Sequence, residues 1–373
     1  MLCKLERESF CQGRIKKCKQ TQAIVLKGRI KMKLRDVRTR ARERLRGFCR
    51  VCRICDGRAC AGEMPGMGGR GTGAGFINNV EALARVRLNM TTIHSATEPD
   101  LTYDFFGQKL SFPVLGAPLG GAEINLGGAL TEGEFADAQV RGAVEAGTIA
   151  WTGDGPDPIL YQSGLKAIRA QGGRGVPVIK PRKIRDIMQL IRQAEEHDVL
   201  AVGIDIDAAG FRNMDKAGEF VGPKSVAQLK GIIGGTKLAV ILKGIMTRGD
   251  ALAALETGAA GIVVSNHGGR ALDHTPGTIE VLPEIAAVIR GRLRVFLDGG
   301  IRTGDDVLKA IALGAEAVLV GRPIAIAAFG GGTQGVRRQL EQFKKDLKTA
   351  MIMTGCDNLQ KIGPAVVRPP RGW

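Results

Sequence analysis

The sequence predicts an α/β protein, a (β/α)8 barrel of the TIM type that follows an N-terminal helical and loop extension. Three observations predict this fold. From about residue 112, eight short apolar runs rich in β-branched residues alternate with amphipathic segments. The runs are continuously apolar before their last few residues, as in parallel strands that are buried on both faces. Polar side chains lie at the carboxyl ends of these runs, where a barrel places its active site.

The eight apolar runs are expected to be the barrel strands. They cover residues 112–119, 147–153, 176–182, 199–206, 238–245, 261–267, 294–301 and 317–323. Helical patterns lie between them, among them residues 184–196, 248–257, 279–290 and 305–314, and a last helix at about 335–354 closes the ring. Eight such units match a closed barrel, whereas a doubly wound sheet usually needs fewer.

The formal net charge of +17 is concentrated near the N-terminus. About twelve of these charges lie in residues 1–48, so the charge describes a tail and not the whole chain. A basic helix from Lys33 to Arg46 would suit an acidic partner, but it is also typical of a solvated surface helix. Alternatively, the natural protein could begin at Met32, in which case most of the basic stretch before it would not belong to the protein. Because no recognition motif accompanies the charge, we do not expect a nucleic-acid partner.

We expect three parts along the chain. They are a basic extension over residues 1–48, a Cys- and Gly-rich segment over residues 49–111 that packs on the barrel, and the barrel itself over residues 112–373. No run of about twenty apolar residues exists, so no membrane span is expected. The charged N-terminus does not fit a signal peptide, which favours a cytoplasmic protein with reduced thiols.

Polar side chains cluster at the expected carboxyl ends of the strands. They are Lys180, Asp205, Asp207, Lys243, Asn266, His267, Asp298 and Arg322. Charged groups at the ends of apolar strands are costly to bury without a purpose. Since the active site of a barrel lies at this end, the pattern predicts an enzyme site.

The segment SNHGGRALD, residues 265–273, ends the sixth strand with a histidine and an arginine. His267 could serve as a general base near neutral pH. Arg270 offers a planar fork that suits a carboxylate. The alternative for His267 is a loop histidine that only satisfies backbone groups.

Two glycine-rich loops follow the seventh and eighth strands. They contain Gly299, Gly300 and Arg302 in DGGIRTGDD, and Gly321 and Arg322 in VGRP. Barrels commonly bind phosphate at this position through glycine amides and a helix N-terminus. Glycine alone also serves tight turns, but two adjacent loops that each carry an arginine favour a phosphate site. Lys243 ends the fifth strand in ILKG. Its positive charge could face a bound cofactor, or it could simply pair with a neighbouring carboxylate.

Four motifs together resemble one enzyme family. The motifs LKG, SNHGGRALD, LDGGIRTGDDVLKAIALGA and VGRP are similar to those of the FMN-dependent α-hydroxy-acid oxidases and dehydrogenases, which include glycolate oxidase, lactate oxidase and flavocytochrome b2. The resemblance is dense over residues 238–361, thinner over 112–210 and poor before about residue 60. It implies FMN as cofactor, oxidation of a 2-hydroxy acid to a 2-oxo acid, a small carboxylate substrate and a homo-oligomer.

The resemblance also implies roles for individual residues. Lys243 would stabilise negative charge on the flavin, His267 would take the substrate hydroxyl proton, and Arg270 would bind the substrate carboxylate. An aspartate that orients the base would be Asp205 or Asp207, and the sequence leaves both open. The residues implied to hold FMN are Ala117, Pro118, Lys243, Ser265, Asp298, Gly299, Gly300, Arg302, Gly321 and Arg322.

The chain departs from the family pattern around the substrate. Family members use two active-site tyrosines, but Tyr103 and Tyr161 are the only tyrosines here and neither lies at those places. The position on the third strand is taken by Ile179 or Lys180, so Lys180 could contact substrate or merely pair with an aspartate. Arg212 could be a second carboxylate-binding arginine.

These departures leave the substrate open. The loop over residues 208–224 is also shorter than the long lid typical of the family, which suggests a more open pocket. The alternatives are therefore a flavin barrel that acts on a peptide-borne group or performs an isomerisation, and a basic flavin-binding protein without turnover.

The N-terminal segment contains Cys49, Cys52, Cys55 and Cys60. The spacing C-x2-C-x2-C resembles iron–sulfur segments, but the spacing to the fourth cysteine and the absence of a following proline do not fit the ferredoxin run. We therefore expect ordinary reduced cysteines and no metal. The next stretch, MPGMGGRGTG, lacks the lysine of a Walker motif, which predicts a loop near the flavin instead of a P-loop.

Overall fold

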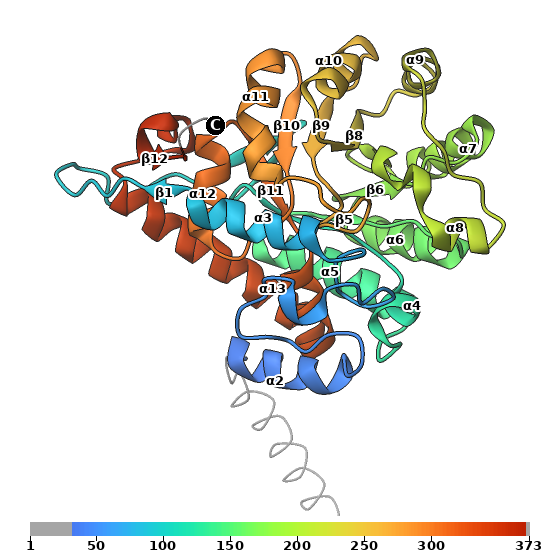
Figure 1. The fold of residues 1–373 in the computed structure, drawn as a ribbon, viewed down its shortest axis with the longest axis horizontal. Helices are drawn as coiled ribbons and strands as arrows, with labels where there is room; N and C mark the ends of the chain where they lie inside the picture. Colours follow the sequence, from blue (N-terminus) through green and yellow to red (C-terminus); the bar gives the residue numbers. More distant parts are fainter. Residues whose placement is uncertain (1–31, 371–373) are drawn as a thin grey trace, which may run out of the picture. The chain divides into compact units, whose positions relative to one another are not determined.

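Eight parallel strands form a closed barrel in the computed structural model, which describes residues 32–370 apart from the side chain of Arg212. The chain divides into residues 1–33 and 34–373, and the second unit contains the barrel. The strands, shown in Figure 1, are β4 (Val114–Leu119), β5 (Ala150–Thr152), β6 (Gly175–Ile179), β7 (Val202–Asp205), β8 (Val240–Ile245), β9 (Gly261–Val264), β10 (Arg294–Leu297) and β11 (Ala317–Val320). Seven lie within the predicted runs and β6 begins one residue before its run, so the predicted fold class is confirmed.

The ladder closes because β11 pairs with β4, with Leu319 opposite Leu115. Every residue of β5, β6, β7, β9 and β11 is buried, as expected for strands with a filled interior on one side and helices on the other. The strands are parallel throughout the barrel. Their carboxyl ends therefore lie at one rim.

Helices surround the barrel (Figure 1). They are α5 (Glu132–Ala146), α6 (Pro158–Ala170), α7 (Ile184–Glu195), α9 (Val226–Gly234), α10 (Arg248–Glu256), α11 (Thr278–Ile289), α12 (Gly304–Ala312) and α13 (Arg322–Met353). Those predicted between strands are present, with ends within two residues of the prediction. The last helix starts earlier than the predicted residue 335, because α13 includes a first half that a non-helical Gly332 separates from the second.

An aromatic cluster fills the amino end of the barrel. A hairpin of β2 (Tyr103–Phe105) and β3 (Gln108–Leu110) precedes β4 directly. Its Phe105 ring contacts the rings of Trp151 and Phe296, with centroids 6.4 Å and 5.7 Å away. All three side chains are fully buried. This end is therefore closed, and the chemistry has access only from the carboxyl ends of the strands.

The segment before the barrel covers that carboxyl end. Helix α2 (Leu34–Arg44), the basic helix predicted at residues 33–46, packs against α13 through Val37 and through Arg44, which donates to the carbonyl of Phe329. After a short 3-10 helix, η1 (Arg58–Cys60), and helix α3 (Ala74–Arg85), the chain pairs β1 (Arg87–Leu88) with β12 (Val367–Arg368). Between η1 and α3, Arg70 donates its amide to the carbonyl of Gly269, which follows β9.

Within residues 32–370, no helix is long and apolar enough to cross a membrane.

Candidate active site

A cavity of about 850 Å³ opens at the carboxyl ends of the strands. Most of the residues that were predicted for the site line it: Ala117, Pro118, Lys180, Lys243, His267, Arg270, Asp298, Gly299, Gly300, Arg302, Gly321 and Arg322. They come from the carboxyl-terminal parts of six different strands and from the loops that follow them. The cavity exists because strand ends that are far apart in sequence meet at one rim of a closed barrel.

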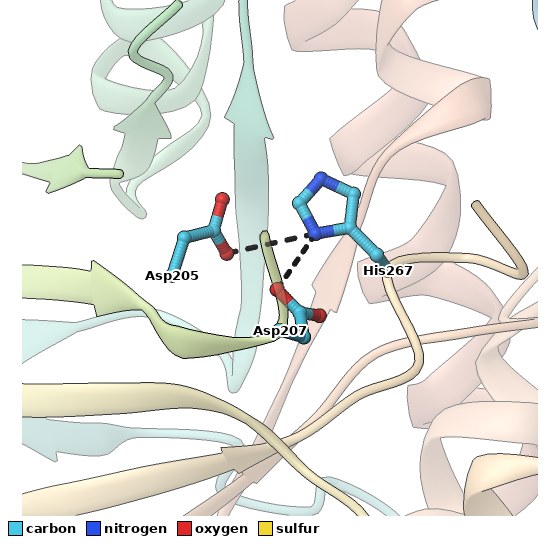
Figure 2. A group of neighbouring side chains, drawn as sticks. All are labelled: Asp205, Asp207 and His267. Carbon is cyan, nitrogen blue, oxygen red and sulfur yellow. Dashed lines mark hydrogen bonds and ion pairs between the residues drawn. The ribbon is translucent and has the colours of Figure 1, made fainter. Parts of the chain in front are cut away.

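His267 stands three residues after β9 and has a left-handed backbone, with φ of 58°. Its amide donates to the hydroxyl of Ser265 at 3.0 Å, which holds the turn. The ring atom Nδ1 lies 3.0 Å from Oδ1 of Asp207 and 3.7 Å from Oδ1 of Asp205 (Figure 2). The second ring nitrogen points away from both carboxylates (Figure 2). A backbone strained in this way is common where a side chain must be held in one orientation.

The two aspartates that the sequence left open occupy different environments. Asp205 ends β7, is 3% exposed and accepts from two ammonium groups: Nζ of Lys180 at 2.6 Å and Nζ of Lys243 at 3.0 Å. Asp207 lies in the 3-10 helix η2 (Ile206–Gly210) that follows β7, and its closest contact is His267. The geometry therefore places Asp207, not Asp205, at hydrogen-bond distance from the imidazole.

Lys243 is the central cation of this cluster. Besides Asp205, its Nζ lies 3.8 Å from Asp207 and 3.7 Å from Asp298, and 3.4 Å from Nδ1 of His267. Burial opposes its charge, but the three carboxylates outweigh burial and raise the pKa of Lys243 above the ordinary lysine value. Burial would also raise the pKa of Asp205, but its two lysine partners hold that pKa well below the usual range.

The group Asp205, Asp207 and His267 has ligand atoms close enough to hold a metal ion. The ammonium of Lys243 already lies within hydrogen-bond distance of two of these side chains. A buried cation at this position compensates the carboxylates and repels a second cation. We therefore interpret the group as a lysine-centred ion cluster.

Arg270 lies across the cavity. One terminal nitrogen donates to the carbonyls of Gly66 and Gly68, at 2.7 Å and 2.9 Å, and the other to Oδ1 of Asn125 at 3.3 Å. Among the described residues no carboxylate forms an ion pair with it, and burial lowers its pKa to about 10. A buried guanidinium without an anionic partner favours an anionic ligand.

Two further arginines line the same cavity near the predicted glycine loops. Arg322 donates to the carbonyls of Met67, Gly68 and Gly268, and its guanidinium stacks 3.6 Å from the centroid of the Phe76 ring. Burial, together with nearby Arg270, lowers the pKa of Arg322 to about 9. Arg302 donates to the carbonyl of Cys55 at 3.1 Å. Neither arginine forms an ion pair with a carboxylate in the part of the chain that the structure describes.

These observations fit an FMN molecule. Asp298 is 7% exposed, its Oδ1 has no hydrogen-bond partner among the described residues, and burial raises its pKa. Such an orphan acceptor suits a hydroxyl of the ribityl chain, and the unpaired arginine charges suit a phosphate. Gly299 and Gly300 have φ of 97° and 82°, so the loop exposes backbone at the cavity in a conformation that favours glycine.

Three of the predicted residues do not line the cavity. Ser265 is fully buried and accepts a hydrogen bond from the backbone amide of His267. Asp205 and Asp207 do not line the cavity themselves but contact Lys243 and His267, which do. Arg212 begins helix α8 (Arg212–Lys216), but its side chain lies outside what the structure describes.

Sequence reasoning missed several lining residues. The ring of Phe211 packs edge-on against the imidazole of His267, with centroids 4.8 Å apart. Asp154 accepts from the Lys180 amide and from Arg182, which joins the ends of β5 and β6. Asp154 directly follows a predicted strand run, so the strand-end rule would have found it. Phe211 lies in an irregular loop and carries no such signal.

Cys49, Cys52, Cys55 and Cys60 are free and partly exposed. No three of them have sulfur atoms within 4.8 Å of one another, because the described residues give only the Asp205, Asp207 and His267 group at that limit. Burial raises the pKa of Cys49 to about 11.

Comparison with known proteins identifies the family. A family model described as FMN-dependent dehydrogenase matches residues 66–229 and 223–369. A 4-hydroxymandelate oxidase of Amycolatopsis orientalis is 34% identical over 333 residues, which is 78% of this chain and 89% of the relative. A peroxisomal (S)-2-hydroxyacid oxidase of Arabidopsis thaliana is 32% identical over 321 residues, which is 76% of this chain and 85% of the relative.

Solved structures agree with the sequence matches. A crystal structure of mandelate oxidase superimposes with a TM-score of 0.74 at 32% identity and covers 90% of this chain and 97% of that one. A mandelate oxidase variant with a C4a-OH-FMN adduct gives a TM-score of 0.72 at 34% identity, covering 87% and 96%. The resemblance expected from four motifs thus extends over most of the chain, which belongs to the FMN-dependent dehydrogenase family as an α-hydroxy-acid oxidase-like enzyme with FMN as its cofactor.

Proposed function

We propose that this enzyme oxidises a 2-hydroxy acid to a 2-oxo acid, with His267 as the base. The observation that supports this most directly is the contact between His267 and Asp207 at a cavity that also holds Lys243 and Arg270. Such a reaction needs a base, a group that orients the base, a cation and a guanidinium group that binds the carboxylate.

The proton transfer follows from the orientation of the imidazole. A neutral ring that donates Nδ1–H to Asp207 keeps Nε2 as the acceptor, and Nε2 points away from both carboxylates (Figure 2). We propose that Nε2 takes the hydroxyl proton of the substrate. Asp207 then stabilises the imidazolium that forms, because its carboxylate lies 3.0 Å from Nδ1.

FMN, when bound, supplies the acceptor for the α-hydrogen and the two electrons of the substrate. In this proposal Lys243 places a buried positive charge beside the cofactor, and Asp205 fixes that charge from behind at 3.0 Å. Arg302, Arg322 and the glycines after β10 and β11 hold the phosphate and ribityl parts. Ala117 and Pro118, at the end of β4, contribute backbone to the same wall.

Arg270 is proposed to bind the substrate carboxylate. Its terminal nitrogens are held by Gly66, Gly68 and Asn125, so the fork is fixed before substrate arrives. The relatives include a glycolate oxidase and a 4-hydroxymandelate oxidase, which is consistent with a small hydroxy-acid substrate. The homo-oligomer and the cytoplasmic location remain predictions from the sequence.

Lys180 is the observation that favours a substrate different from those relatives. It lines the cavity, is 6% exposed, and lies 4.9 Å from the centroid of Phe211 while it pairs with Asp205. An ammonium there adds positive charge to a pocket that already has Arg270. We propose that the substrate carries a second acidic or polar group beyond its carboxylate.

Anaerobic reduction of the bound flavin tests the proposed reaction. The FMN-loaded protein is mixed with a panel of 2-hydroxy acids, including dicarboxylic ones, and flavin absorbance is followed. At least one acid should bleach the flavin with one 2-oxo acid formed per flavin. If none bleaches a flavin that dithionite does reduce, the proposed reaction is wrong.

A further inference from the structure

The active site leaves one group of potential metal ligands unused: Cys49, Cys52, Cys55 and Cys60, in the segment between α2 and α3. All four line a single small cavity. Met67 and Arg322 form part of its wall and also line the large active-site cavity. The cysteine-lined cavity is therefore adjacent to the proposed phosphate-binding region.

The backbone folds around these sulfur atoms. Val51 and Gly57 have φ of 49° and 92°, and each turns the chain so that cysteines on both sides face the same cavity. The amide of Val51 donates to Sγ of Cys49 at 3.3 Å. Amide hydrogen bonds to sulfur are among the features by which proteins adjust thiolate-bound clusters. A left-handed Val is costly, so the turn indicates a local requirement beyond chain connectivity.

Positive charge borders the cavity on its inner side. Arg302 donates through Nε to the carbonyl of Cys55 at 3.1 Å, and its Nη2 lies 3.5 Å from Sγ of the same residue. Arg322 lines the cavity as well. These two guanidinium groups, which are also proposed to hold the FMN phosphate, therefore place positive charge next to the sulfur atoms.

The sulfur atoms do not stand in the arrangement of a zinc site. A zinc ion binds thiolates at about 2.3 Å, so any two of its sulfur ligands are less than about 4.6 Å apart. No three of the described cysteines meet even a 4.8 Å limit. An iron–sulfur cluster keeps its thiolates further apart, because the cluster itself lies between them. The C-x2-C-x2-C run resembles that of four-iron clusters, although the four residues before Cys60 and the absent proline depart from the ferredoxin run.

We propose that Cys49, Cys52, Cys55 and Cys60 are the four ligands of a [4Fe–4S] cluster. Arg302 and Arg322 then lie between the cluster and the active-site cavity. The cavity itself, about 20 Å³, holds no more than a water molecule, so binding the cluster requires the loop to move outward. Its tip at Ile54 is 70% exposed, and the hydrogen bonds from Arg38 and Arg42 to the carbonyls of Cys52 and Val51 would have to adjust.

The test uses the full chain, purified without oxygen and reconstituted with ferrous iron and sulfide. Iron and acid-labile sulfide should each reach roughly four per chain, and dithionite should produce the EPR signal of a reduced four-iron cluster. Cys52→Ser and Cys55→Ser should each lose most of the iron and the signal while they retain FMN, which shows that they fold. The site assignment does not depend on the proposed reaction, because none of these readings uses a substrate.

Two controls address the other cysteines of the chain. Cys356→Ser changes a buried thiol that contacts Thr354 and lies far from the four cysteines in sequence. A triple variant, Cys3→Ser, Cys11→Ser and Cys18→Ser, removes the remaining thiols of the chain. Both should retain iron and sulfide. Absence of sulfide from the reconstituted protein, stoichiometric zinc in its place, or unchanged iron in Cys52→Ser and Cys55→Ser would each overturn the proposal.

Discussion

Atom Nδ1 of His267 lies 3.0 Å from Oδ1 of Asp207, while Asp205, two residues earlier, contacts lysines instead. The two carboxylates therefore contact different groups of the cluster. Asp207 fixes the tautomer and rotation of the imidazole, and Asp205 compensates Lys180 and Lys243. Each assignment predicts a different consequence of removing the charge.

Asp207→Asn should slow the reductive half-reaction without loss of FMN. An amide cannot stabilise the imidazolium and can present an N–H to Nδ1, so the proton would shift to Nε2, where the base is needed. We expect the rate of flavin reduction to fall by about 10²–10⁴-fold. Anaerobic stopped-flow over a range of pH measures this. A decrease below tenfold with an unchanged pH profile would show that Asp207 does not orient the base.

Asp205→Asn should destabilise the fold, because it leaves two buried ammonium groups without their shared carboxylate. The expected loss is about 3–5 kcal/mol of unfolding free energy. The pKa of Asp205 is lower in the folded than in the unfolded protein, so its contribution is complete above the unfolded value of about 4 and is lost as the pH falls below it.

Urea unfolding of the two proteins at several pH values checks this prediction. The difference in unfolding free energy should be constant around neutral pH and should shrink below about pH 4. A difference that grows on acidification would contradict the assignment.

Arg322→Gln should weaken the binding of FMN more than that of riboflavin. The guanidinium is proposed to contact the phosphate, which riboflavin lacks, and a charged hydrogen bond of about 1.5–3 kcal/mol corresponds to roughly 10–100-fold in Kd. Fluorescence titration of the apoprotein with both flavins gives the ratio, with exposed Arg290→Gln as control. An equal loss for both flavins would assign Arg322 to structure, through its contacts with Met67 and Gly68.

Lys180→Met should raise KM for an acidic substrate and change kcat little. The methionine keeps the length of the side chain, and Asp205 retains Lys243, so the pocket loses mainly one positive charge. Steady-state kinetics with a dicarboxylic 2-hydroxy acid and with its ester at the distal carboxylate separates the two roles. Only the diacid should lose affinity, and exposed Lys183→Met should affect neither. Equal losses for acid and ester would show that Lys180 serves only to pair with Asp205.

The barrel could be predicted from sequence because its strands carry a strong signal. A strand that is buried on both faces is apolar along its length, and polar residues begin only where it ends. The same pattern therefore predicts both the strands and the residues at the rim of the site. His267, Arg270 and Lys243 were predicted in this way to lie at the cavity, and so were Arg302 and Arg322 of the proposed phosphate region.

The choice between Asp205 and Asp207 could not be made because side chains alternate along a strand. Residues two apart point to the same face, so both aspartates were suitable while the strand was assumed to continue. In the structure β7 ends at Asp205, and η2 carries Asp207 toward His267 from a different direction. A strand end is defined by backbone hydrogen bonds, and the residue pattern does not fix it to one position.

The partners of Arg270 and Arg322 could not be predicted for a related reason. Both guanidinium groups donate to carbonyls of the segment around Gly66 and Gly68, which lies between 202 and 254 residues away in sequence. Every residue has a carbonyl, so such contacts leave no side-chain signal. The glycines do indicate close backbone approach, but not what approaches them.

Anaerobic reduction of the His267→Ala variant tests the central claim most directly. The variant and the wild type are loaded with FMN and mixed with the 2-hydroxy acid that bleaches the wild type fastest. His274→Ala is the matched control, since His274 lies on the same loop with a side chain that is 73% exposed. We expect His267→Ala to bind FMN and to lose reduction by at least about 10²-fold, with His274→Ala unchanged. Reduction of His267→Ala at the wild-type rate would contradict the assignment of His267 as the base.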